Sequence, residues 1–594
     1  MIARSYVNSE YPMKKKPFYY LPTFLLSCTL LLTGCHKTNS TQIYQEREAF
    51  DDYLNHIFAC TVNSDSLTLN YTLLDSSLYG IDACEPTLGE YTLESMKKEN
   101  EQKQFYLDGL SDYNYKYLTK DQQLCYDMLK NRLSLDLKYA DYTLYHEILG
   151  PTTGLQAQLP ILLAEYNFNT KSDIDRYLEL IKDTPRYFNQ ICAMEHLKST
   201  SGLFMSDAVA KEIINQCNAF IQNKDSNYLI EYFDAKLDSL TFLSDSERTS
   251  YQKKNKEFVL TYMIPSYENL IATLTNLLGT GTNDQGLYYY KNGKSYYEYL
   301  VKSKTGTSHT MTELAHMLDE TLYEVLIDIS SYAKSESDLS SRIEAYTYIE
   351  TEPAKILNYL KEEIQKDFPA LPNVNCSIKY VHPSLQDYIS PAMYLIPPID
   401  SYNENTIYIN TNPMYDMSEI FTTIAHEGYP GHLYQCVYYR SKDVHPVRNV
   451  ITNLGYEEGW ATYAELYSYN LGGLDSSVAA ILQDNMIATH CIYSRADIGI
   501  HYEGWSKEKT QQYLSSYVSK EARESIYSTL LEEPAIYLPY SIGYLEISEL
   551  KEIANKSLGD KFNLKDFHTF LLDLGPVDFT IAKSSLSSWL KEQK

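Results

Sequence analysis

The stretch that decides how this chain is interpreted is His426-Glu427-Gly428-Tyr429-Pro430-Gly431-His432. It places two imidazoles and a carboxylate together near the C-terminal end of an expected helix. In zinc peptidases, two His residues on one face of a helix bind the metal, and the Glu after the first His activates the attacking water. The stretch therefore predicts a zinc site with His426 and His432 as ligands and Glu427 as the general base.

The spacing of the two His residues is unusual, because the second follows the first by six positions and not by four. Six steps of a regular helix turn a side chain by about 600°, so both could not share a face. Pro430 removes the N–H that would bond to the carbonyl of His426, and Gly431 allows backbone angles closed to other residues. We therefore expect a local bulge that swings His432 back beside His426. The alternative is that both are surface or capping residues.

A third ligand is expected in the segment Glu458-Gly459-Trp460-Ala461. This core resembles the Glu-Gly-Phe-Ala of zinc aminopeptidases, in which the Glu is the third zinc ligand. Glu458 follows His432 by roughly two dozen residues, which is typical of such enzymes. Glu465 lies seven positions further on the same helical face, where it could orient a ligand His. A solvated acidic helix is the alternative.

A second Glu-Gly-Trp, at residues 503–505, competes for the role of third ligand. Ser506 is placed to start a new helix there, which leaves Glu503 in a loop. Glu458 instead leads into a helix suited to rigid ligation, so we prefer it.

The combined pattern resembles a bacterial family known as domain of unknown function 885, whose members carry His-Glu-x-x-Pro-Gly-His. Further segments that fit it are residues 391–398, 495–501, 539–543 and 562–568. That family looks like a branch of the Glu-zincin peptidases, similar in plan to the funnel-shaped helical oligopeptidases and carboxypeptidases. The resemblance is clearest over the C-terminal third, and it implies zinc chemistry more firmly than it implies a substrate.

The resemblance also suggests roles for three residues outside the metal motif. Related helical peptidases place a Tyr in a late segment to stabilise the oxyanion, so Tyr540 is the first candidate for this donor and His501 the second. Arg495 could hold a substrate carboxylate through two parallel hydrogen bonds, which would favour an exopeptidase. Each of the three could instead be structural.

One extended region, residues 376–410, interrupts the helical pattern. Its alternating stretch 406–410 suits an edge strand beside the site. In zinc peptidases such an edge pairs with the substrate backbone, so Tyr408 and Asn410 are candidate substrate-binding residues. A purely structural hairpin is the alternative.

Most of the remaining chain has helical periodicity, as at Ile174, Tyr177, Leu178 and Ile181. The expected fold is therefore mostly α: a large helical, zinc-peptidase-like fold with a cleft or funnel and a small β element beside the active site. We expect an N-terminal helical subdomain over 36–250 and a catalytic helical subdomain over 251–594.

The first 35 residues resemble a lipoprotein signal peptide. Lys14-Lys15-Lys16 precede an apolar run that closes on Leu32-Thr33-Gly34-Cys35. The run is too short to favour a permanent transmembrane helix. Bacterial lipoproteins are cleaved before such a Cys and acylated on it, so we expect Cys35 to carry the lipid that anchors an exported protein to the outer side of the cell membrane. Met13 starts a more typical signal than Met1.

Charge and cysteine content exclude other classes. The net charge is −27, from 51 basic and 78 acidic residues, which argues against nucleic acid as a partner. Eight Cys residues follow Cys35 without a close CxxC pair, so a thiolate zinc site is not expected. Cys60 with Cys84 is the nearest possible disulfide, and isolated thiols are equally compatible with the sequence. The sequence does not determine the oligomeric state.

These observations predict a membrane-anchored zinc metallopeptidase that hydrolyses short peptides, carboxypeptidase- or dipeptidase-like in its action. One alternative is a non-catalytic lipoprotein that binds peptides or metals, although binding alone does not require the base Glu427. Another is a zinc hydrolase of a different amide, such as a cell-wall fragment.

Overall fold

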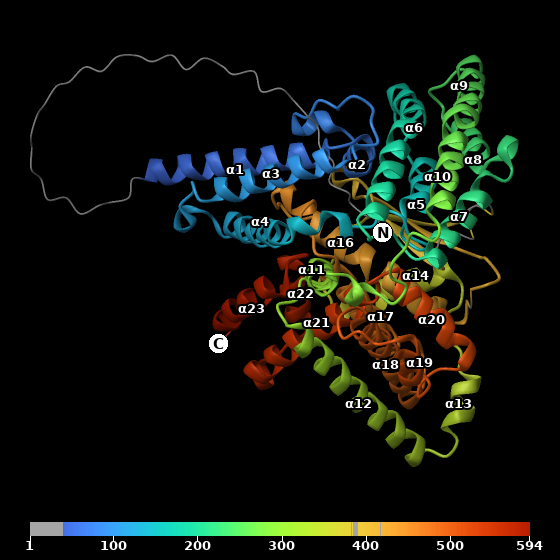
Figure 1. Cartoon of the computed structure of the whole chain (residues 1–594). Helices are drawn as coiled ribbons and strands as arrows, with labels where there is room; N and C mark the ends of the chain where they lie inside the picture. Colours follow the sequence, from blue (N-terminus) through green and yellow to red (C-terminus); the bar gives the residue numbers. More distant parts are fainter. Residues whose placement is uncertain (1–39, 382, 384–385, 387–389, 416, 594) are drawn as a thin grey trace, which may run out of the picture.

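The computed structural model describes residues 40–593, except 382, 384–385, 387–389 and 416 (Figure 1). Cys35 and the rest of the expected signal peptide lie outside these described residues. The chain is mostly helical, with one small three-stranded sheet, which confirms the predicted fold class. Within the described ranges, no helix has the length and apolarity needed to cross a membrane.

The first helices pack together at one side of the molecule (Figure 1). Two of them begin at capping boxes, in which Thr92 pairs with Ser95 and Thr119 pairs with Gln122. The bounds are α1 (Ser40–Val62), α2 (Ser66–Thr72), α3 (Leu93–Leu110) and α4 (Lys120–Lys138).

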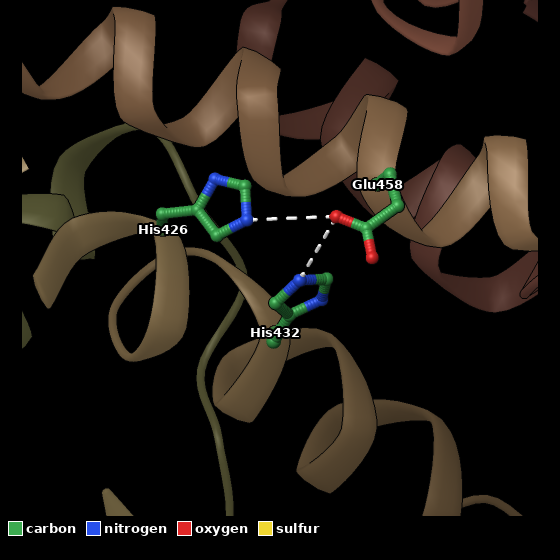
Figure 2. Close-up of side chains that lie close together, drawn as sticks. All are labelled: His426, His432 and Glu458. Carbon is green, nitrogen blue, oxygen red and sulfur yellow. Dashed lines mark ion pairs between the residues drawn. The ribbon is translucent and has the colours of Figure 1, made fainter. Parts of the chain in front are cut away.

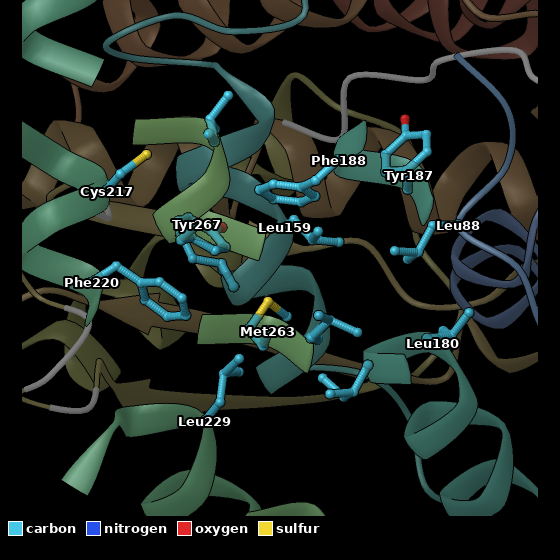
Figure 3. Packing of buried hydrophobic residues seen from close by; sticks show 14 of the residues in the cluster. Leu88, Leu159, Leu180, Tyr187, Phe188, Cys217, Phe220, Leu229, Met263 and Tyr267 are labelled. Carbon is cyan, nitrogen blue, oxygen red and sulfur yellow. The ribbon is translucent and has the colours of Figure 1, made fainter. Parts of the chain in front are cut away.

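The next helices surround the largest hydrophobic cluster, part of which is drawn in Figure 3. The ring centroid of Tyr267 lies 4.4 Å from that of Phe220 and 5.0 Å from that of Phe188. This cluster continues past residue 250 to Leu277, so the packing does not change where we expected a subdomain boundary, and the division stays a prediction. The helices are α5 (Leu155–Ala164), α6 (Lys171–Thr200), α7 (Asp207–Ile221), α8 (Tyr228–Asp238), α9 (Asp245–Phe258) and α10 (Ile264–Leu277).

The sheet contains β1 (Asn375–Tyr380), β2 (Ala392–Leu395) and β3 (Glu404–Ile409) in the order β1-β3-β2. Strand β3 is parallel to β1 and antiparallel to β2. Alternation along β3 places Ile407 and Ile409 in the C-terminal core and Tyr408 against the cluster of α5–α10. The sheet therefore joins the two cores.

The helices of the C-terminal half, drawn from green to red in Figure 1, pack in separate clusters, of which the largest contains α14 to α17. Their bounds are α11 (Gly293–Thr305), α12 (Met311–Ser335), α13 (Leu339–Ala345), α14 (Pro353–Glu363), α15 (Ile420–Glu427), α16 (His432–Arg440), α17 (Leu454–Ser468), α18 (Ser476–His501), α19 (Lys507–Leu514), α20 (Lys520–Glu532), α21 (Leu538–Leu558), α22 (Leu564–Leu574) and α23 (Phe579–Gln593). A Cβ added at Gly459 of α17 would lie 2.3 Å from the carbonyl carbon of Gly543 of α21. The two backbones are therefore in direct contact, which only glycine permits there.

All eight Cys residues in the described part of the chain are free thiols, including Cys60 and Cys84. Five of them are buried. The structure thus favours isolated thiols over the disulfide that the sequence left open.

Candidate metal centre and active site

The two His residues of the opening motif belong to different helices. Helix α15 ends at Glu427, and α16 begins at His432. Between them Gly431 donates its N–H to the carbonyl of Ala425 at 3.0 Å, and a Cβ at Gly431 would lie 1.8 Å from the carbonyl oxygen of His426. Glycine is required at this close approach. The expected bulge in one helix is thus a full break, and it brings the imidazoles of His426 and His432 to a centroid distance of 4.8 Å.

The surrounding core holds this turn in place. The indole N–H of Trp460 donates to the carbonyl of Pro430 at 2.9 Å, so α17 is hydrogen-bonded to the turn. Trp460 itself is fully buried. The inner face of α15 is buried through Ile420, Phe421, Ile424 and Ala425. A rigid support of this kind is what a preorganised site requires.

Glu458 of α17 completes a cluster with the two imidazoles (Figure 2). Its Oε2 lies 3.4 Å from Nε2 of His432 and 3.6 Å from Nε2 of His426. This oxygen is buried and accepts no hydrogen bond from the described residues. A buried carboxylate oxygen without a partner costs free energy unless a cation or donor satisfies it.

The cluster fits a zinc ion. Zinc binds imidazole nitrogen and carboxylate oxygen at about 2.0–2.2 Å, which separates neighbouring tetrahedral ligands by roughly 3.4 Å. The separations between Glu458 and the two imidazoles match this value. Two His and one Glu are also the donor set of catalytic zinc sites that keep a position open.

The charges around the cluster favour a cation. Burial opposes ionisation of Glu458, yet His432 and His426 lower its pKa to about 2. Burial likewise opposes protonation of His426, but Glu458 and Glu465 raise its pKa well above the usual value in the metal-free protein. Glu465 also places its Oε2 2.9 Å from Nδ1 of His426, so this carboxylate orients the ring with Nε2 toward Glu458.

Glu427 stands beside the cluster at the end of α15. Its Oε2 accepts a hydrogen bond from the backbone N–H of Tyr394 in β2, at 2.8 Å. Strand β2 therefore fixes the carboxylate that the sequence predicts as the base.

Tyr540, in the first turn of α21, also reaches the cluster. Its ring centroid lies 6.2 Å from that of His426, with the planes 24° apart. Burial, followed by Glu458 and Glu427, raises the pKa of Tyr540 well above its usual value, so the hydroxyl keeps its proton at neutral pH. The structure thus brings the first oxyanion candidate to the site.

His490 of α18 is a neighbour that the sequence analysis missed. Its ring stacks on Tyr540 at 6.1 Å, and burial lowers its pKa, so the imidazole is neutral. No motif spacing marks this position, because the other His of α18, His501, lies at the far end of the helix and belongs to a different contact.

The structure corrects the candidate role of His501. This side chain is fully buried, its Nδ1 accepts the N–H of Leu287 at 3.1 Å, and its Nε2 lies 2.8 Å from the carbonyl of Leu530. With both ring nitrogens engaged by backbone groups, His501 is not available as an oxyanion donor.

Arg495 is also engaged elsewhere. Its guanidinium pairs with Asp319 at 3.1 Å and with Glu503 at 3.0 Å, and it lies 4.7 Å above the ring of Trp505. Two carboxylates already neutralise the charge, so Arg495 does not offer a free fork for a substrate carboxylate. The same pairing accounts for Glu503, which is not part of the metal cluster.

The expected edge strand at residues 406–410 is wrong, because β3 is the central strand and pairs on both sides. Tyr408 donates its hydroxyl to Glu165 at 3.1 Å, and Asn410 donates its amide to the carbonyl of Gln386 at 2.7 Å. Neither residue is therefore placed to pair with a substrate. The edge beside the site is β2, whose Tyr394 contacts Glu427.

A second group of possible ligands comprises His309, Glu546 and Glu549. Here a cation is already present, because Nζ of Lys583 lies 2.9 Å from Oε2 of Glu546 and 2.9 Å from Oε2 of Glu549. This cluster is an internal ion-pair network and not a second metal site.

Comparison with known proteins assigns the family. The family described as "Bacterial protein of unknown function (DUF885)" matches residues 75–585, so the chain belongs to it. No curated protein matches the chain.

Solved structures show the same fold. A candidate lipoprotein from Colwellia psychrerythraea aligns with a TM-score of 0.81 at 17% identity, over 92% of this chain and 99% of that one. A candidate lipoprotein of unknown function from Shewanella oneidensis aligns with a TM-score of 0.64, also at 17% identity and over 92% and 99% of the two chains.

Proposed function

We propose that this member of the DUF885 family is a zinc-dependent peptidase that acts on short peptides. The observation that carries the proposal is the buried Oε2 of Glu458, which faces two imidazole nitrogens without a hydrogen-bond donor, next to the carboxylate of Glu427. The ligands would be His426, His432 and Glu458. A bound zinc would supply Lewis-acid polarisation of a substrate carbonyl and of water.

Glu427 would act as the general base. It is held through Oε2 by the N–H of Tyr394, and Oε1 has no hydrogen-bond partner in the described part of the chain. Oε1 can take the proton from the attacking water and pass it to the leaving amine. A non-catalytic binding protein would have no use for this carboxylate.

Tyr540 would donate its hydroxyl proton in a hydrogen bond to the developing oxyanion. Its high pKa keeps the donor protonated, and its place in the first turn of α21 holds it against His426. A preorganised donor of this kind typically contributes a factor of about 10²–10³ to the rate.

The substrate backbone would align along β2 instead of β3. The N–H of Tyr394 points to the edge of β2 that pairs with no described strand, where Glu427 accepts it. Ala392, two residues earlier, directs its backbone groups to the same edge. Strand addition at this edge would run past Glu427. Since Arg495 is paired, we expect free-acid and C-terminally amidated peptides to be cleaved within about threefold of each other, which a comparison of kcat/KM would check.

The protein is also proposed to be exported and anchored through a lipid on Cys35. This rests on the signal-like sequence that ends there. Replacing Cys35 by Ser should move the protein out of the membrane fraction, and unchanged retention would contradict the anchor.

Metal analysis combined with a peptide-library digest tests the function. Residues 36–594 should contain zinc and cleave peptides, whereas the Glu427→Gln protein should keep zinc and lose cleavage. Zinc without cleavage in the wild type would favour a metal-binding lipoprotein, and cleavage confined to non-peptide amides would favour another zinc hydrolase.

A further inference from the structure

The turn that leads into α21 contains the one non-glycine residue with positive φ in the described ranges, Ala535, with φ of 61°. Ala535 is fully buried. The left-handed conformation is strained for an L-residue, so surrounding contacts must hold it.

Asp497 supplies the most direct of these contacts. Its two carboxylate oxygens lie 3.2 and 3.0 Å from the N–H of Ala535, which donates to them. The hydroxyl of Tyr297 in α11 also donates to Oδ1 of Asp497. All three groups are fully buried, so this carboxylate fixes the strained residue from α18.

Two further sets of contacts hold the same turn. Lys304 of α11 donates to the carbonyl of Pro534 at 3.0 Å. The carboxylate of Glu533 accepts the backbone N–H groups of Thr152 and Thr153, each at 3.0 Å, from a loop in the N-terminal half. The turn is thus held by segments that lie far apart in the sequence.

The element that this turn positions is the first turn of α21. That helix begins at Leu538, and Tyr540 is its third residue, five positions after Ala535. Any relaxation at Ala535 would shift the start of α21 and move the Tyr540 ring relative to His426.

We propose that Asp497 is a positioning residue for Tyr540, which it acts upon through the left-handed turn at Ala535. This inference rests on the proposed function, in which the Tyr540 hydroxyl contacts the reacting carbonyl. It also gives a role to the segment 495–501, which contributes no group to the metal cluster itself.

A double-mutant cycle between Asp497 and Tyr540 tests the coupling. Asp497→Asn should lower kcat by about 10–100-fold with KM changed less than about threefold, because a misplacement of 1 Å can cost that much. Tyr540→Phe should lower kcat by about 10²–10³-fold. The double variant should be no slower than Tyr540→Phe alone, within about threefold. If the fold-losses in kcat of the two single variants multiply in the double variant, the proposal is overturned.

A matched control is Asp65→Asn. Asp65 is a buried carboxylate that likewise accepts a backbone N–H, from Thr68 at 2.8 Å, but at the start of α2. Alone, this variant should have the kcat of the wild type. Combined with Tyr540→Phe, it should have the kcat of Tyr540→Phe alone. If Asp497→Asn does not fold, Tyr297→Phe removes only the hydroxyl bond to Asp497, and it should show a smaller change in the same direction.

Crystal structures of the wild type and of Asp497→Asn give a readout that needs no turnover. The ring of Tyr540 should move by about 1 Å or more from its place against His426. A Tyr540 that stays in place would overturn the proposal even if peptides are cleaved. Loss of the proposed function is seen separately, as a wild-type protein that cleaves no peptide.

Discussion

Two clusters of histidine and glutamate side chains lie in the C-terminal half, and they differ in what balances their carboxylates. In the first cluster (His426, His432, Glu458), Oε2 of Glu458 faces two imidazole nitrogens, and no lysine or arginine of the described residues pairs with it. In the second cluster (His309, Glu546, Glu549) the ammonium of Lys583 lies between both carboxylates at 2.9 Å. The residue types alone do not distinguish a metal centre from an ion-pair network, whereas the presence or absence of a lysine ammonium between the carboxylates does.

The carboxylate of Glu427 lies beside the first cluster at the end of α15, and its replacement gives the largest expected effect. Glu427→Gln should lower kcat by about 10³-fold or more, because an amide cannot accept the proton of the attacking water. Zinc content and melting temperature should stay near the wild-type values. A variant that retained a near-normal rate on the best peptide would make Glu427 a structural residue.

Removing Lys583 should make the second cluster resemble the first, because no ammonium would then lie between its carboxylates. Lys583→Met keeps the apolar stem but removes the ammonium, which leaves Glu546 and Glu549 the imidazole of His309, 3.7 Å from each. The change should cost about 2–3 kcal/mol of unfolding free energy. The urea midpoint would measure this loss. Added zinc should raise the melting temperature of this variant more than that of the wild type. An unchanged urea midpoint would show that the ion pairs contribute nothing.

The buried histidines outside the first cluster should produce a smaller, pH-dependent effect. Burial lowers the pKa of His501 and His568 to about 4 in the folded chain, against about 6.5 when unfolded. The unfolded chain therefore takes up protons first, so the stability from each residue is fully present above pH 6.5 and is lost as pH falls through 4. Each contributes on the order of 3 kcal/mol at most.

His501→Gln in the metal-free His426→Ala, His432→Ala background would isolate the pH-dependent stability that His501 contributes, since zinc loss then plays no part. The dependence of the urea midpoint on pH should become flatter between 6.5 and 4.5. Burial raises the pKa of Asp497 and Glu195 to about 7, so their contributions have the opposite sign and are lost as pH rises. The contribution of these carboxylates cancels when the urea midpoints of parent and variant are subtracted at each pH. If the two midpoints change with pH to the same extent, His501 does not have the lowered pKa.

The sequence was most informative where chemistry is local. The spacing of His426 and Glu427, with the Pro-Gly pair that follows, marks the site, and helical periodicity predicts the fold class. Strand order was not predictable, because the alternation at 406–410 suits a central strand as well as an edge. His501 and Tyr540 both lie in motif segments, and only packing separates a backbone-bonded imidazole from a hydroxyl beside the metal cluster. The counter-ion Lys583 comes from α23, which is separated from Glu546 in the sequence, and no spacing rule connects the two residues.

The zinc content of the purified protein tests the central claim most directly. Elemental analysis of residues 36–594 should find about one zinc per chain. The His426→Ala, His432→Ala double variant should be nearly empty, while His309→Ala, the matched change in the second cluster, should keep the full amount. Full zinc occupancy in the double variant, or loss of zinc in His309→Ala alone, would contradict the account.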